Sequence, residues 1–297
     1  MQHSVKQQAF RGELRDHESM ARHCSWRAGG EADLYYEPVD KQDLADFIGT
    51  LDPELPITWV GLGSNLLVRD GGLRGVAIVV LKRLNELSFT EDGRVYAEAG
   101  VTCARLARFC QRAGLSGADF LAGIPGTVGG ALAMNAGAFG FETWQFVEAV
   151  EMMDRSGQIT QRDRAQFEIG YRSVSHDPDE WFSAGWLRFP ERNQAEESRI
   201  RELLHQRNIT QPIGQPSCGS VFKNPKDDYA ARLIEACGLK GHCLGQACVS
   251  DKHANFIINT GNALANDIED LIEFVRASVA AKFSIHLQHE VRIVGDR

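Results

Sequence analysis

The stretch that decides the fold runs from Leu121 to Gly140 and reads Leu-Ala-Gly-Ile-Pro-Gly-Thr-Val-Gly-Gly-Ala-Leu-Ala-Met-Asn-Ala-Gly-Ala-Phe-Gly. Six of its twenty residues are glycine, and it contains no Lys, Arg, Asp or His. Glycine allows positive φ and close approach of other groups, and oriented peptide N–H groups form concavities that bind anions. The stretch therefore predicts a surface that holds a large phosphate-bearing ligand by backbone and shape. Tight packing of a helix on a sheet is the alternative explanation for this run alone.

A second glycine-rich stretch begins at Trp59 and reads Trp-Val-Gly-Leu-Gly-Ser-Asn-Leu-Leu-Val-Arg-Asp-Gly-Gly. Its pattern indicates a strand, a tight turn and a further strand. Leu66 stands where a dinucleotide fingerprint needs its third glycine, and no helix follows, so a Rossmann site is excluded. A phosphate-binding turn of another fold remains.

Composition restricts the possible classes of protein. The 297 residues are 43% hydrophobic and 24% charged, which is typical of a soluble globular protein with two or three subdomains. A net charge of −8 without a Lys/Arg cluster argues against nucleic acid as the partner. No apolar run is long enough to span a membrane, and the polar segment 1–23 lacks the apolar core of a secretory signal. We therefore expect a cytoplasmic protein that does not insert into a membrane.

Cysteine and histidine usage bears on redox state and metals. Seven cysteines without a C-x-x-C motif lead us to expect reduced thiols. His286, His289 and Glu290 have the residue types of a metal site, but they lie at the start of a predicted strand and no second cluster supports them. We expect no metal.

Periodicity and turn residues predict mixed α and β structure in three segments, 1–83, 84–190 and 191–297. The last strand of the third segment can pack with the first two segments instead of the third. Predicted helices cover 40–48, 102–113, 196–207, 229–237 and a stripe from Ile268 to Val279. Predicted strands cover 33–36, 57–61, 76–81, 87–90, 95–99, 147–154, 159–161, 181–189, 254–258 and 291–294.

Three further groups of residues have the chemistry of a catalytic site. Arg172 lies in Gly-Tyr-Arg-Ser at the end of an apolar strand, Ser220 in the turn-rich loop Cys-Gly-Ser-Val-Phe-Lys-Asn-Pro, and Glu290 at the start of the closing strand. Taken singly, each has a structural explanation: an ion pair, a loop hydroxyl and a strand-edge charge.

Together with the glycine stretches, these motifs resemble the UDP-N-acetylenolpyruvoylglucosamine reductase (UDP-N-acetylmuramate dehydrogenase, MurB) family over nearly the whole chain. The sequence Lys252-His-Ala-Asn-Phe adds to the resemblance. Cys24 where threonine is commoner, and Ser284 in a turn commonly Phe-Gly-Ile, are departures away from the chemistry. The short chain after Arg172 resembles the compact subtype, which lacks an extra flap over the substrate.

The resemblance implies an α+β fold in which FAD is held by two α+β subdomains of the vanillyl-alcohol-oxidase (PCMH) type, with a C-terminal α+β substrate-binding subdomain. It implies non-covalent FAD, because neither glycine stretch contains the histidine that tethers flavin in some relatives. The implied FAD-binding residues are Gly61, Gly63, Ser64, Asn65, Leu66, Gly123, Ile124, Pro125, Gly126, Gly129 and Gly130.

The implied reaction is NADPH-dependent reduction of the enolpyruvyl group of a UDP-sugar in peptidoglycan precursor synthesis. Arg172 would stabilise the substrate carboxylate, Ser220 would donate the proton to C2, and Glu290 would hydrogen-bond this network. Tyr171, Arg207, Lys223 and Asn224 are the candidate substrate contacts. We expect a monomer. The alternatives are an FAD-dependent oxidase on the same fold and a non-catalytic nucleotide-binding module.

Overall fold

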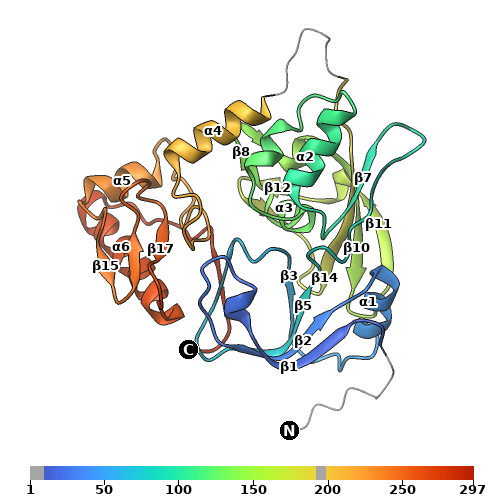
Figure 1. The fold of residues 1–297 in the computed structure, drawn as a ribbon, viewed down its shortest axis with the longest axis horizontal. Helices are drawn as coiled ribbons and strands as arrows, with labels where there is room; N and C mark the ends of the chain where they lie inside the picture. Colours follow the sequence, from blue (N-terminus) through green and yellow to red (C-terminus); the bar gives the residue numbers. More distant parts are fainter. Residues whose placement is uncertain (1–9, 192–198) are drawn as a thin grey trace. The chain divides into compact units, whose positions relative to one another are not determined.

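The computed structural model describes residues 10–191 and 199–297. The chain forms two compact units (Figure 1). The first unit comprises residues 10–15, Leu34–Leu62 and the described part of Gly75–Leu204, and the second unit comprises Asp16–Asp33, Gly63–Arg74 and His205–Arg297. The chain passes between the units within strands β1 (Glu13–Ser19), β2 (Glu31–Glu37) and β5 (Leu73–Val79). The three-segment division at 83 and 190 remains a prediction.

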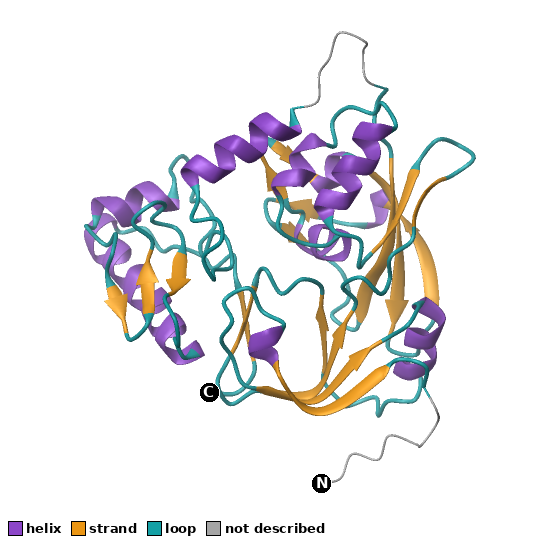
Figure 2. Ribbon diagram, viewed as in Figure 1, coloured by secondary structure: helices purple, strands orange, loops and turns teal. Residues whose placement is uncertain are grey.

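The main sheet of the first unit has the strand order β11-β10-β14-β7-β6, and each neighbouring pair is antiparallel (Figure 2). Helix α3 packs on this sheet, since a Cβ atom at Gly185 of β14 would lie 3.2 Å from the Leu132 side chain. Trp144 is 1% exposed and donates its indole N–H to the Leu132 carbonyl at 2.8 Å. The elements are β6 (Leu87–Phe89), β7 (Val95–Glu98), α2 (Cys103–Arg112), α3 (Val128–Met134), β10 (Val147–Asp154), β11 (Ile159–Asp163) and β14 (Glu180–Leu187).

A second sheet has the order β1-β2-β5-β3, in which β3 (Ile57–Val60) runs parallel to β5. Helix α1 (Lys41–Ile48) begins at Asp40, whose carboxylate accepts from the Asp43 backbone N–H at 2.9 Å. Such a side-chain cap satisfies one of the free N–H groups at a helix start. The apolar face of α1 then buries Leu44, Phe47 and Ile48, as the spacing of these residues predicts.

Two short hairpins complete the first unit. Strands β8 (Gly137–Ala138) and β9 (Phe141–Glu142) pair inside the glycine-rich stretch, across a turn in which Phe139 and Gly140 both have positive φ. Strands β12 (Ile169–Gly170) and β13 (Ser173–Val174) pair on either side of Tyr171 and Arg172. These hairpins were not predicted, because strands of two residues have no measurable periodicity.

The second unit is built around helix α6 (Ala265–Phe283), whose predicted apolar stripe is buried. Asp70 caps this helix, since its carboxylate oxygens accept from the Ala265 and Asn266 N–H groups, each at 2.9 Å. A small sheet has the order β15-β16-β17, and a separate parallel pair joins β18 to β4. The remaining elements are β4 (Leu66–Val68), α5 (Ala230–Ala236), β15 (Cys243–Leu244), β16 (Ala247–Val249), β17 (Ile257–Asn259) and β18 (Arg292–Val294).

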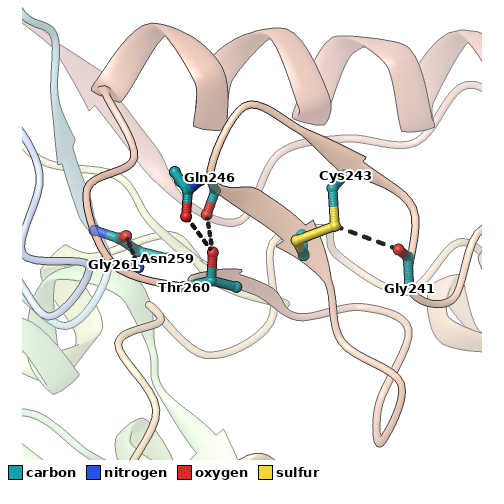
Figure 3. Close-up of a disulfide and its surroundings, with 7 residues drawn as sticks. Gly241, Cys243, Gln246, Asn259, Thr260 and Gly261 are labelled. Atoms are coloured by element: carbon teal, nitrogen blue, oxygen red, sulfur yellow. Dashed lines mark hydrogen bonds between the residues drawn. A yellow bond between two sulfur atoms is a disulfide. The ribbon is translucent and has the colours of Figure 1, made fainter.

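A disulfide joins Cys243 to Cys248 across the β15–β16 hairpin (Figure 3). The expectation that all thiols are reduced is therefore wrong for this pair. The two cysteines are five positions apart, and only the hairpin, which the sequence analysis did not predict, places them opposite each other. Figure 3 also shows Thr260 bonded to Gln246, where the Thr260 hydroxyl donates to the Gln246 carbonyl at 2.9 Å.

Most predicted elements are confirmed with ends that shift by a few residues. Helix α4 (Ile200–Thr210) lies where a helix over 196–207 was predicted, and residues 196–198 lie outside the described part of the chain. Strand β1 was not predicted, because its seven residues are mostly polar and exposed. Among the described residues, no helix combines the length and the apolar character needed to cross a bilayer.

Candidate active site

Arg172 is held at the tip of the β12–β13 hairpin in the first unit. It has a left-handed backbone with φ of 51°, and its side chain is 15% exposed. Its Nη2 donates to the Gly137 carbonyl at 2.8 Å and its Nη1 to the Asn135 carbonyl at 3.3 Å. The neighbouring Tyr171, 47% exposed, has its ring 5.1 Å below the guanidinium carbon. The two carbonyls come from the glycine-rich stretch, so this stretch and Arg172 form one local site.

Several glycines of the predicted FAD site lie close to other residues of the first unit. A Cβ atom added at Gly61 would lie 2.4 Å from Thr127 Oγ1. A Cβ atom added at Gly123 would lie 2.4 Å from the Phe139 ring, and one added at Gly129 would lie 2.7 Å from the Ala99 side chain. Real Cβ atoms do not approach so closely, so a side chain at any of these positions would require a neighbour to shift. At Gly61 and Gly123 that neighbour is the end of a side chain, whereas at Gly129 it includes the Ala99 backbone at 3.2 Å. Tight packing therefore accounts for Gly129 of helix α3, and the predicted contacts of these glycines with FAD stay predictions.

Gly130 differs from the other glycines of the stretch. It is exposed, its φ is not positive, and an added Cβ would meet nothing nearer than Thr127 Oγ1 at 3.7 Å. Neither backbone strain nor protein packing demands glycine there. The fold therefore does not explain Gly130, and its predicted contact with FAD stays a prediction. Ile124, Pro125 and Gly126 lie just before Thr127, whose hydroxyl accepts from the Gly130 N–H at 3.4 Å.

Ser220 lies in the second unit, on a segment fixed by main-chain bonds. The next residue, Val221, donates to the Asn255 carbonyl at 2.9 Å. The Asn255 side chain then brackets Phe222: its Oδ1 accepts from the Phe222 N–H at 3.0 Å, and its Nδ2 donates to the Phe222 carbonyl at 2.8 Å. Asn255 is 3% exposed, so these bonds lie away from solvent. The segment after Ser220 is therefore rigidly placed.

Glu290 and the turn 63–66 join the same segment. The Glu290 N–H donates to the Val221 carbonyl at 2.8 Å, and the Asn65 side-chain amide donates to the Glu290 carbonyl at 2.8 Å. Arg292 in turn donates its N–H to the Asn65 carbonyl at 3.0 Å. The second unit thus brings together Ser220, Glu290 and the turn that contains Gly63, Ser64, Asn65 and Leu66.

Cys218 adds a further link to this turn. Its sulfur lies 3.6 Å from the Gly63 carbonyl oxygen and 3.5 Å from the Leu66 carbonyl oxygen. Burial raises the pKa of the Cys218 thiol well above its usual range, so the group stays a neutral donor. Gly63 has φ of 66°, and an added Cβ would lie 1.9 Å from the His23 carbonyl oxygen. Glycine is required at position 63 by the fold.

The predicted substrate contacts have different surroundings. The Asn224 side chain accepts from the Ala230 N–H at 3.1 Å and so caps helix α5, while the Lys223 backbone N–H donates to the Gln288 carbonyl at 2.9 Å. Arg207 of α4 donates its Nε to the neutral side chain of Gln211 at 3.1 Å. Burial lowers the pKa of the Arg207 guanidinium. A half-buried guanidinium with this neutral partner is suited to an anionic ligand.

The chain matches two family models and many curated relatives. Residues 32–162 match the FAD binding domain, and residues 211–294 match the UDP-N-acetylenolpyruvoylglucosamine reductase C-terminal domain. The UDP-N-acetylenolpyruvoylglucosamine reductase of Alkalilimnicola ehrlichii is 57% identical over 96% of this chain and 96% of its own. That of Methylococcus capsulatus is 54% identical over 96% and 94%. The chain belongs to the UDP-N-acetylenolpyruvoylglucosamine reductase family.

A solved structure agrees with this assignment. The MurB reductase of Thermus caldophilus is 32% identical, with a TM-score of 0.80 over 95% of this chain and 98% of that one. Together with the FAD-binding domain, this confirms the α+β FAD-binding fold expected from the sequence. The residues present fit the cofactor, because exposed Gly130 leaves peptide backbone open in a stretch without charged side chains.

The residues that hold the candidate catalytic groups were not predicted from the sequence. Asn135 and Asn255 are 1% and 3% exposed, and each uses its amide to tie distant segments together. Both asparagines lie inside the stretches on which the family resemblance rests. An uncharged polar residue among apolar residues was therefore the sequence feature that could have identified them. The distant partners could not be read from the sequence, since Gly170 lies 35 positions from Asn135 and Phe222 lies 33 positions from Asn255.

Proposed function

We propose that this reductase converts UDP-N-acetylglucosamine enolpyruvate to UDP-N-acetylmuramate for peptidoglycan synthesis, with NADPH as hydride donor and non-covalent FAD. The observation that carries the proposal is the chain of bonds in the second unit from Asn65 to Glu290 and from Glu290 to Val221, beside Ser220. One scaffold thereby fixes a turn predicted to bind the cofactor and two groups predicted to act on the substrate. Bound FAD would supply hydride transfer from NADPH to C3 of the enolpyruvyl group.

Arg172 is proposed to stabilise the charge that this hydride transfer creates. Hydride addition at C3 leaves an electron pair at C2 that spreads into the adjacent carboxylate. A guanidinium binds carboxylate oxygens in a planar, bidentate manner and does not lose its proton. Fixed charge aimed at developing charge is usually the largest catalytic term. The bonds from Arg172 to Gly137 and Asn135 hold the guanidinium in advance of substrate.

Ser220 is proposed to donate the proton that completes the reaction at C2. The hydroxyl O–H breaks, a C2–H bond forms, and solvent returns a proton to the serine. A serine hydroxyl is weakly acidic, so the transfer depends on neighbours that stabilise the oxygen as it loses its proton. Glu290 is proposed to hydrogen-bond this network, since its backbone is tied to the residue after Ser220.

Substrate binding is proposed to use cations on the second unit. Arg207 and Lys223 would contact the nucleotide phosphates, with Asn224 ordering the same loop through its bond to α5. Tyr171 would contact the substrate beside Arg172. We further propose a monomer located in the cytoplasm, where nucleotide sugars and NADPH are available.

Two measurements test the function. NADPH consumption should depend on the enolpyruvyl nucleotide and should not require oxygen; oxygen-dependent turnover of a reduced alcohol would point to the oxidase alternative. Acid precipitation should release the flavin into the supernatant, whereas yellow colour retained in the pellet would show covalent attachment.

Arg172→Lys separates the two halves of the reaction. Lysine keeps the charge but loses the planar fork. Stopped-flow measurement should therefore show slower oxidation of reduced flavin by substrate and an unchanged rate of flavin reduction by NADPH. Equal slowing of both would place Arg172 in the fold or the cofactor site.

A further inference from the structure

We propose that Asn135 and Glu142 are positioning residues that set the guanidinium of Arg172. This inference rests on the proposed role of Arg172 in the reaction. The three residues come from separate points of the first unit: the end of α3, strand β9 and the β12–β13 turn. They are joined by hydrogen bonds and an ion pair.

Asn135 is built into the structure at a position that few residues tolerate. It ends α3 with a left-handed backbone, φ 45° and ψ 55°, and is 1% exposed. Asparagine is among the few non-glycine residues that adopt this conformation readily. Its side-chain oxygen accepts from the Trp144 N–H at 3.1 Å. The bond to its oxygen therefore orients the Asn135 amide, and this orientation fixes the direction of its two N–H donors.

Those two donors connect the two hairpins of the first unit. One donates to Glu142 Oε2 at 2.9 Å and the other to the Gly170 carbonyl at 3.0 Å. Glu142 pairs with Gly137 in the β8–β9 hairpin, and Gly170 pairs with Ser173 across the turn that contains Arg172. A single buried amide thus holds the turn that carries Arg172 against the hairpin that receives its guanidinium.

The guanidinium of Arg172 contacts both Asn135 and the β8–β9 hairpin. Its guanidinium donates to the Asn135 and Gly137 carbonyls, and Nη1 lies 3.9 Å from Glu142 Oε1. One carboxylate therefore accepts from Asn135 through one oxygen and faces Arg172 with the other. Such an arrangement limits the rotation of the guanidinium, and a misplacement of about 1 Å can slow a reaction by about 100-fold.

The experiment compares two substitutions with one control. Asn135→Asp keeps the shape, the left-handed backbone and the acceptor for Trp144, but removes both donors. Glu142→Gln keeps the acceptor for Asn135 and removes the charge facing Arg172. The matched control is Glu148→Gln, the same change at an exposed carboxylate of the first unit that pairs with Arg188.

Flavin oxidation by substrate should slow by about 10- to 100-fold in Asn135→Asp and by about 10-fold in Glu142→Gln. In both test variants, the flavin content and the rate of flavin reduction by NADPH should match the wild type. The thermal midpoint of Glu142→Gln and every rate of Glu148→Gln should also match the wild type. Wild-type oxidation rates in both test variants would overturn the proposal. Equal slowing of both half-reactions would overturn it too. If Asn135→Asp does not fold, Glu142→Gln decides.

A double variant shows whether the effect passes through Arg172. In an Arg172→Lys background, Asn135→Asp or Glu142→Gln should have little further effect, because the group that they position is already gone. Losses that multiply fully would overturn the proposal. A wild-type rate of flavin oxidation in Arg172→Lys alone would instead show that the proposed role of Arg172 is wrong.

Discussion

The two units fix their candidate catalytic groups in different ways. In the first unit, the guanidinium of Arg172 is held at its own end, by the backbone carbonyls of Gly137 and Asn135 at 2.8 and 3.3 Å and by the Glu142 carboxylate at 3.9 Å. In the second unit, Ser220 and Glu290 are held through the main chain, by a bond between Glu290 and Val221 and by the neutral amides of Asn255 and Asn65. The difference matches the two kinds of chemistry that are proposed.

A guanidinium acts by charge at the end of a long side chain, so its direction must be set by partners at that end. A serine hydroxyl lies one carbon from the backbone, so fixing the backbone restricts the oxygen to the few staggered rotamers of one bond. It follows that removal of the Glu142 charge should affect the first unit alone, whereas loss of a buried amide should affect either unit through the segment that the amide holds.

Ser220→Ala should have the largest effect. It removes one oxygen and leaves the main-chain bonds of Val221 and Phe222 in place. If Ser220 donates the proton to C2, the oxidation of reduced flavin should slow by roughly 10²–10⁴-fold, as is typical of a lost general acid. Flavin content and flavin reduction by NADPH should not change. Stopped-flow absorbance of the flavin measures both steps.

Cysteine at position 220 is the matched comparison for that variant. A thiol has similar reach and is more acidic than a hydroxyl, so Ser220→Cys should recover part of the lost rate. Near-wild-type turnover in Ser220→Ala would refute the role of Ser220, and the proton would then have to come from Glu290 or water.

Asn255→Ala should have the next largest effect, on both stability and rate. It leaves the buried N–H and carbonyl of Phe222 without their amide partner, and each unsatisfied group costs about 1–3 kcal/mol. We expect the free energy of unfolding to fall by about 2–4 kcal/mol. Oxidation of reduced flavin should also slow, because the segment after Ser220 is released. Urea denaturation and stopped-flow kinetics measure the two quantities.

Asn259→Ala is the control for that substitution. Asn259 is equally buried in the second unit, and its amide bonds Trp26, Gly261 and Ala263 instead of the segment after Ser220. It should cost similar stability and leave the rate of the folded enzyme unchanged. If both variants lose rate alike, Asn255 acts only through global stability.

The sequence predicted the parts of this molecule that have a pattern or a motif. The α6 stripe and the helices α1 and α2 follow from local spacing, so they could be predicted without a structure. Arg172, Ser220 and Glu290 were picked out only as members of a family motif. What places them could not be read from the sequence, because bonds such as that from Asn65 to Glu290 span 225 positions.

The glycines illustrate the same limit of prediction from sequence. A glycine-rich stretch predicts close approach, but it does not say what approaches. In the structure, Gly123 faces the Phe139 ring and Gly129 faces Ala99, whereas Gly130 is exposed and has no close neighbour. Three glycines of similar appearance in the sequence thus have at least two different surroundings, and only the structure distinguishes them.

Reduction of the Cys243–Cys248 disulfide should have a smaller effect, confined to stability. The closed loop is short, so chain entropy predicts a loss of about 2 kcal/mol on reduction. Neither cysteine contacts Ser220, Glu290 or Asn255 through the bonds described above, so the rates should not change. Denaturation with and without a dithiol reductant measures the difference. A Cys243→Ser/Cys248→Ser variant should be insensitive to the reductant, and a reductant effect that persists in it would assign the effect elsewhere.

Mild acid should produce the smallest effect and should act on the second unit first. His253 accepts the Asn255 N–H at its Nδ1 at 3.3 Å, and burial lowers the pKa of His253, with Lys240 also acting in that direction. A group whose pKa is lower in the folded state contributes stability that is complete above its unfolded pKa, near 6.5, and is lost as pH falls through the folded value. Acid should therefore weaken the hold of Asn255 on the Ser220 segment, which lies in the second unit. Urea denaturation at pH 7.5 and pH 5.5 should show a loss of stability that is smaller in His253→Gln, whose amide can accept the same bond without titrating. An equal loss in both proteins would show that other groups, and not His253, govern the response to acid.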